Sequence, residues 1–173
     1  MTTRRHWMKC AIATAALACG LPAGAQDDPG KAKIGSVSVI VYFGTNADPK
    51  GAGSKPGSAD EANLKRLRAE NRLDFKNYRV LGKDVQPLLR SYESWAQPLK
   101  PSDEILVRFE ARSVPTKELT RLDLELWLSR KKILKTDARL EGDKPLFILG
   151  PEWRGGRLIV AVALAPNQKP VSK

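Results

Sequence analysis

The chain has 173 residues and a formal net charge of +11, from 30 Lys and Arg residues against 19 Asp and Glu residues. Its only histidine, His6, and its two cysteines, Cys10 and Cys19, all lie close to the N-terminus. Beyond residue 25 no side chain can supply thiol redox chemistry, haem attachment, Ser-His-Asp hydrolysis or a zinc site of nitrogen or sulfur ligands. The composition therefore predicts a non-catalytic protein without a metal or another cofactor.

Residues 1–25 have the organisation of an export signal that is cleaved. A positively charged start precedes an apolar run of about 12 residues, which is too short for a bilayer span of about 20 residues. The small residues Ala23 and Ala25 suit a signal peptidase, so Gln26 is the expected new N-terminus.

The export route stays open between the general secretory and twin-arginine pathways. Residues 3–9 resemble the bacterial twin-arginine signal, although Trp7 and Met8 replace its usual Phe-Leu pair. A lipid anchor on Cys19 is disfavoured, because the usual leucine three residues before the cysteine is absent.

Cleavage after Ala25 leaves 148 residues with a net charge of +8, from 27 basic residues against 19 acidic ones. This length suffices for one domain with its own core. We expect a flexible tail over residues 26–33, a single β-rich domain over 34–166 and a second flexible tail over 167–173. The protein is expected in the periplasm or outside the cell.

Residues 34–43 predict a strand, because β-branched and aromatic residues are frequent and apolar side chains alternate along one face. The glycine-rich segment 44–59 follows. It lacks the Gly-Lys-Ser/Thr ending of a phosphate-binding loop and contains two prolines, so it indicates a surface loop and no nucleotide site.

Residues 60–73 form the one helix that the pattern predicts. Ser58 or Asp60 can cap its start, and Leu64 and Leu67 begin an apolar stripe. Basic residues occupy its other faces and the segment that follows; they are Lys65, Arg66, Arg68, Arg72, Lys76, Arg79 and Lys83. Such charge either solvates a helix face or forms a docking surface for an anionic partner.

From residue 76 onward the pattern is that of successive short strands. They are expected at residues 78–81, 85–90, 92–97, 105–111, 146–149 and 158–164, with turns at 82–84 and 98–103. The last strand is apolar on both faces, which predicts a central strand or one that the helix covers.

The clearest strand pair covers residues 119–140. Four leucines at even positions from 122 to 128 alternate with other residues, as in a strand with one face in a core. The second run is apolar at even positions too, so a three-residue loop at 130–132 gives matching faces. The expected cross-strand pairs are Leu128 with Leu134, Asp123 with Arg139, and Glu125 with Asp137.

Trp127 lies by alternation on the polar face of this pair. An exposed tryptophan can stack on a sugar ring or contact a protein; otherwise it packs across the sheet near Lys135 or beneath the helix. The candidate binding surface consists of Lys65, Arg66, Arg68, Arg72, Lys76, Arg79, Trp127 and Lys135.

The sequence thus predicts an antiparallel β-sandwich or half-open barrel of about seven or eight strands, with one helix after the first strand. Carboxylates that alternate with basic residues along the strands indicate a solvated sheet face and no catalytic acid pair. We expect a non-catalytic extracytoplasmic module that binds another envelope protein or assists envelope assembly. The alternative is a module that binds an anionic polymer or carbohydrate. Neither a nucleotide nor a membrane span after signal cleavage is expected.

Overall fold

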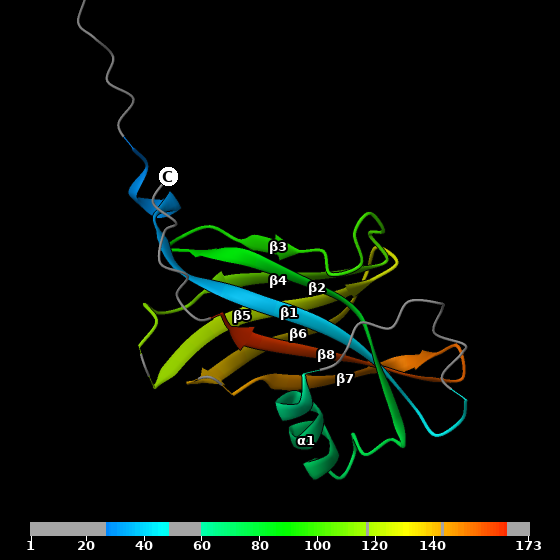
Figure 1. Cartoon of the computed structure of the whole chain (residues 1–173). Helices are drawn as coiled ribbons and strands as arrows, with labels where there is room; N and C mark the ends of the chain where they lie inside the picture. Colours follow the sequence, from blue (N-terminus) through cyan, green and yellow to red (C-terminus); the bar gives the residue numbers. More distant parts are fainter. Residues whose placement is uncertain (1–26, 49–59, 117, 143, 166–173) are drawn as a thin grey trace, which may run out of the picture.

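The computed structural model describes residues 27–48, 60–116, 118–142 and 144–165. The predicted export signal, most of the glycine-rich segment and the predicted C-terminal tail lie outside these residues. Eight described strands form two antiparallel sheets of four (Figure 1). The first sheet has the order β2 (Asn77–Leu89), β1 (Lys33–Thr45), β8 (Gly156–Leu164) and β7 (Leu146–Trp153), and the second β3 (Ser94–Ala96), β4 (Ile105–Ala111), β5 (Leu119–Leu128) and β6 (Lys131–Glu141).

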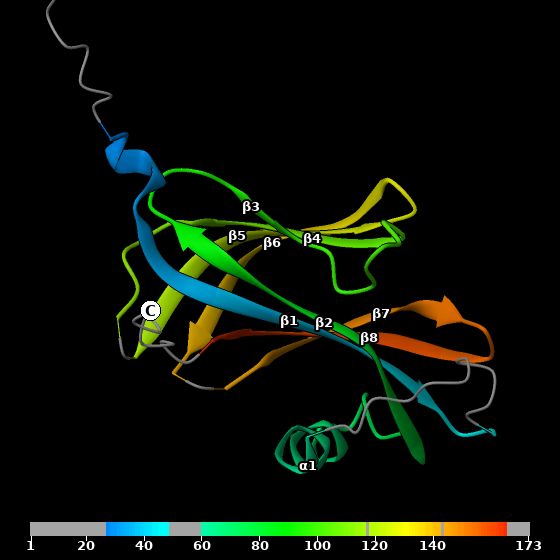
Figure 2. The ribbon, with the colours of Figure 1, turned by 45° about the horizontal axis from the view of Figure 1, so that its top comes forward.

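The two sheets face each other across one apolar core (Figure 2). Alternation along each strand turns one apolar set inward, as period-two patterns require. The buried core residues are Val37, Val39, Val41, Leu88, Ala96, Ile105, Val107, Phe109, Leu122, Leu124, Leu126, Ala138, Leu140, Leu158, Val160 and Val162. The described strands form no closed barrel. The predicted mainly β class, with a helix after the first strand, is therefore confirmed, and the arrangement of the two sheets is sandwich-like.

A second apolar cluster lies on the other face of the first sheet, beneath helix α1 (Glu61–Ala69). Tyr42, Ile159 and Ala161 from β1 and β8 pack there against Leu67. β8 is consequently both central in its sheet and covered by the helix, so both alternatives predicted for it hold together. In the part of the chain that is described, no helix has the length and apolar character needed to cross a membrane.

Helix α1 is shorter than the predicted span of 60–73. Asp60 caps its start, where its carboxylate accepts a hydrogen bond from Ala62 N at 3.1 Å, and extended backbone at Glu70 ends it. Leu73 is nevertheless buried in the cluster beneath the helix. The apolar spacing that lengthened the predicted helix therefore reflects burial of a residue in the turn that follows.

The segment predicted as strands 78–81 and 85–90 is one continuous strand, β2. Gly82 does not mark a turn: a Cβ there would lie 2.0 Å from the carbonyl oxygen of Pro98, so the glycine permits close approach of two backbones. Asp84 accepts a hydrogen bond from Gln97 N at 2.8 Å. Gly82 and Asp84 thus both contact the segment around residue 98.

The β5–β6 hairpin turns at Ser129 and Arg130, whose φ angles are 47° and 65°. The predicted three-residue loop is therefore wrong. A two-residue turn with positive φ matches strand twist, and a bulge next to Trp127 restores the facing of the apolar residues. The faces were predicted correctly, but the pairs shift: Leu126 lies opposite Leu134, Glu125 opposite Lys135, Asp123 opposite Asp137 and Arg121 opposite Arg139.

Part of the segment expected to be an N-terminal tail contacts the domain. Pro29–Lys31 form a 3-10 turn, and the Tyr92 hydroxyl donates a hydrogen bond of 2.5 Å to the Asp28 carboxylate. Arg90 N donates to Ala32 O at 3.0 Å. Residues of the predicted tail are thus held against the edge of the first sheet, ahead of the predicted domain start at residue 34.

Candidate functional site

The structure divides the predicted binding surface between two opposite sides of the molecule. Helix α1 lies against the first sheet, on the side away from the second sheet (Figure 2). This side carries Lys65, Arg66 and Arg68 on α1, with Arg72 and Lys76 shortly after it. Arg79 on β2 lies between Tyr78 and Val80, which pack beneath α1, so alternation turns its side chain to the other face of the first sheet. Trp127 and Lys135 lie instead on the outer face of the second sheet, that is, the face away from the core. The eight residues thus do not form one site.

The basic residues on and after α1 make few contacts that fix their side chains. The guanidinium of Arg68 lies 5.8 Å from the ring centroid of Tyr78, and Lys65, Arg72 and Lys76 are exposed. Arg66 lines a hollow of about 320 Å³ between α1 and the first sheet. The small residues Ala161 and Ala163 form part of that hollow.

Trp127 and Trp95 form an aromatic pair on the outer face of the second sheet. Their ring centroids are 5.9 Å apart and their planes are inclined by 55°. The indole N–H of Trp95 donates to Glu93 and that of Trp127 to Glu125, both at 3.0 Å. Lys132 Nζ lies 5.5 Å from the Trp127 centroid, within cation–π range. Because both indoles are held by carboxylates, the pair is fixed before any ligand arrives.

An ionic network surrounds the aromatic pair. Its centre is Arg108, which bonds to Glu93 and contacts Glu110 at 3.1 Å, Asp123 at 3.7 Å and Glu125 at 3.8 Å. The remaining contacts are Arg112–Asp123 at 3.0 Å, Lys132–Glu125 at 3.3 Å, and Lys135 to Asp123 and to Glu125, both at 3.6 Å. Four carboxylates and four cations thus balance each other.

Two of these carboxylates are buried although they point away from the core. Asp123 is 3% exposed and Glu125 5%, because neighbouring long side chains lie over them. Burial raises the pKa of Glu125, but hydrogen bonds from Trp127 and Lys132 outweigh it and hold that pKa below its usual value. The expectation of an evenly solvated face is wrong at these two positions.

The network also affects the groups at its edge. Hydrogen bonds from Trp95 and Arg108 lower the pKa of Glu93. The bond to Glu93 in turn raises the pKa of Arg108, which stays charged in any case. The ion pair of Glu93 and Arg108 is therefore charged at neutral pH.

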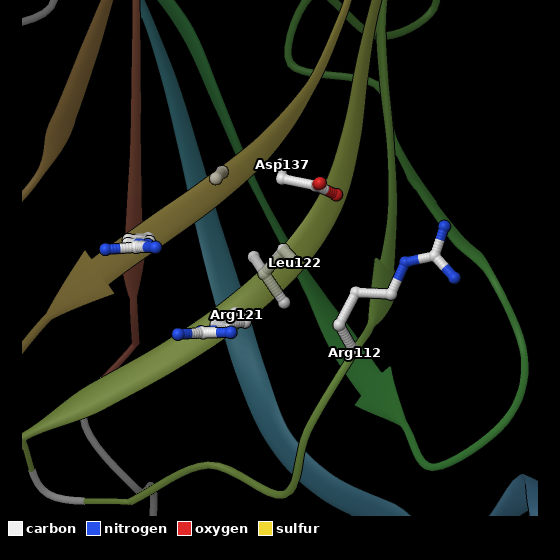
Figure 3. Close-up of a pocket in the computed structure, with 6 residues that line it drawn as sticks. Arg112, Arg121, Leu122 and Asp137 are labelled. Atoms are coloured by element: carbon white, nitrogen blue, oxygen red, sulfur yellow. The ribbon is translucent and has the colours of Figure 1, made fainter.

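Three arginines mark a hollow of about 280 Å³ at one end of the same face (Figure 3). Arg112, Arg121 and Arg139 line this arginine hollow together with Asp137, and Leu122 and Ala138 complete it. In Figure 3 the side chains of Arg112 and Asp137 point to one side, and the side chain of Arg121 points to the other. Arginine guanidinium groups beside one carboxylate can bind an anionic group that also carries hydrogen-bond donors.

The described residues contain no cluster of His, Cys, Asp or Glu side chains suited to a metal ion. Sequence reasoning identified Trp127 and Lys135 on this face but missed Trp95, Arg108, Arg112, Arg121 and Arg139. Alternation could place each of them on a polar face. The order of the strands, which brings them together, has no local signal.

No protein-family model matches the chain, and neither a curated protein nor a solved structure matches it.

Proposed function

We propose that this chain is a non-catalytic binding module, exported by a bacterial cell, that contacts another envelope protein through the outer face of the second sheet. The aromatic pair of Trp95 and Trp127 carries this proposal. Tryptophan and arginine are among the residues most enriched in those that dominate protein–protein binding energy, and Arg108 on β4 lies directly opposite Trp95. Trp95 is 39% exposed, so its ring is accessible to a partner.

Preorganisation supports a binding role for this face. Ordering a free side chain on binding costs about 0.5–1.5 kcal/mol. Both indoles are already held by their carboxylates, so that cost is small here. A β-sandwich, the finer fold class we propose for the two facing sheets, presents such residues from strands, which hold side chains more rigidly than loops do.

The alternative function is binding of an anionic polymer or carbohydrate. The arginine hollow is the feature that such a ligand could use, since guanidinium groups bind carboxylate oxygens. The aromatic pair favours a protein instead. Trp127 has Lys132 near its ring and Trp95 inclined against it by 55°, which leaves no flat platform for a sugar ring.

Export rests on residues 1–25. We expect the mature protein to begin at Gln26, and the intact mass of protein recovered from the periplasm or medium measures this. A mass that retains residues 1–25, or that includes a lipid on Cys19, would contradict soluble export. Replacing Arg4 and Arg5 by lysine blocks export only on the twin-arginine route.

The binding proposal is tested by photocrosslinking in intact cells. A benzoyl-phenylalanine residue replaces Trp95 in one variant and Arg68, on α1, in a control variant. We expect one discrete protein adduct from position 95 and none of that mass from position 68. Equal adduct patterns from both positions, or an adduct from position 95 that glycosidase digestion removes, would contradict a protein partner at this face.

A further inference from the structure

We propose that the arginine hollow binds an acidic segment of the protein partner, through carboxylates that pair with Arg121 and Arg139. This inference rests on the proposed function, because it names the chemistry of that partner. Arg121 on β5 lies directly opposite Arg139 on β6, and Arg112 N donates to Arg121 O at 2.9 Å. Arg112, which directly follows β4, therefore forms one row along the backbone with Arg121 on β5 and Arg139 on β6.

Such a row is unfavourable without a ligand. Like charges directly opposite each other in an antiparallel pair repel. Arg112 is compensated by Asp123 at 3.0 Å, whereas Arg121 and Arg139 have no ion-pair partner among the described residues. Both are exposed. The balanced ionic network on the same face shows the contrast, since every cation there contacts a carboxylate.

The lining of the hollow defines the ligand. A guanidinium group binds a carboxylate through two parallel hydrogen bonds. Asp137 also lines the hollow, and an ionised carboxylate only accepts hydrogen bonds. The ligand must therefore combine anionic oxygens with donors. An acidic peptide does so, with side-chain carboxylates beside backbone N–H groups, whereas a sulfate ion offers no donor.

The position of the hollow also favours a polypeptide. β6 is the last strand of its sheet, so one row of its backbone groups faces away from β5. An extended peptide can pair with such an edge while its side chains reach the adjacent face. Basic residues on an edge strand can also serve only to prevent aggregation. That role predicts no saturable binding at this position.

The test measures binding of fluorescein-labelled octaglutamate to the mature protein by fluorescence anisotropy. One double variant, Arg121→Gln with Arg139→Gln, removes two charges from the hollow. A matched control, Lys65→Gln with Arg72→Gln, removes the same charge from the opposite side of the molecule. We expect the first double variant to weaken binding at least about tenfold and the control less than about twofold. Equal losses in both variants, or no loss in either, would overturn the proposal.

Two further measurements separate binding of an acidic peptide from a structural role of the arginines and from binding of a polysaccharide. The melting temperature of the hollow variant should equal or exceed that of the original protein, because a like-charge pair is removed; a large decrease would assign a structural role to these arginines. Heparin serves as a competitor, and heparin binding that depends on Arg121 and Arg139 without any octaglutamate binding would assign the hollow to a polysaccharide. If the hollow variant and the control variant bind octaglutamate equally well while position 95 still gives its crosslink, only this inference is refuted and the proposed function stands.

Discussion

Thr120 on β5 provides a sharp test of how the core is built. It is 0% exposed, and its hydroxyl has no hydrogen-bond partner among the described residues. A buried hydroxyl without a partner costs about 1–3 kcal/mol. Valine has the same shape and replaces the hydroxyl by a methyl group. Thr120→Val should therefore raise the free energy of unfolding by about 1–2 kcal/mol.

Urea unfolding followed by circular dichroism measures this change, with a thermal melt as a second readout. For a domain of this size, 1 kcal/mol corresponds to roughly 3–4 °C. We thus expect a rise in melting temperature of roughly 3–8 °C. The slope of the unfolding free energy against urea concentration should stay constant, since the surface exposed on unfolding does not change.

Thr136→Val is the matched control. Thr136 lies half-buried on β6, opposite Leu124, so we expect a change within about 0.5 kcal/mol. A decrease of more than about 1 kcal/mol in the Thr120→Val variant would show that the Thr120 hydroxyl has a hydrogen-bond partner. Thr120 would then not be an unsatisfied polar group of the core.

Three other predictions concern packing and charge. Leu126→Asp should abolish cooperative thermal unfolding, because it introduces an unpaired charge at a position that is 3% exposed; a normal melt would contradict the assigned face. Gly82→Ala should lower the melting temperature markedly, since a Cβ there would lie 2.0 Å from a backbone oxygen, whereas Gly35→Ala has its nearest contact at 3.8 Å and should change it little. In the folded protein the pKa values of Glu93 and Glu125 lie below their usual value. These two carboxylates therefore stabilise the fold above the unfolded-state pKa of about 4.3. That stabilisation is lost as the pH falls through their lower folded-state pKa values. Urea unfolding between pH 7 and 3 measures this loss, and equal stability at both ends would contradict it.

The strands and their faces could be predicted because alternation is a local property. The predicted strand 105–111 coincides with β4. Val37, Val39 and Val41 all face the core, as do the leucines at 122, 124 and 126. Each of these strands packs one face on the core, so that face is apolar whichever strands lie beside it.

Register and strand continuity could not be predicted in this way. The β5–β6 register depends on the conformation of Ser129 and Arg130 together with a bulge beside Trp127, and other combinations preserve the same faces. Glycine is typical of turns, but Gly82 is required because the backbone of Pro98 packs against it. Both features depend on contacts that the local sequence does not specify.

The candidate site was predicted only in part for the same reason. Alternation placed Trp127 on the outer face of its strand, but its partner Trp95 lies on β3, with β4 between them. The burial of Asp123 and Glu125 follows from cations on the two neighbouring strands, β4 and β6. The export signal lies outside the described residues and stays a prediction.

The proposed interface with a protein partner is the outer face of the second sheet. The most direct measurement is titration calorimetry of the mature protein with the purified partner that crosslinking from position 95 identifies. We expect Trp95→Ala to weaken binding by about 30-fold or more, the range of an interface hot spot, while Arg68→Ala on the opposite side leaves the affinity within about twofold. An unchanged affinity for Trp95→Ala, with a loss for Arg68→Ala, would place the interface on the side of α1 and contradict binding at the second sheet.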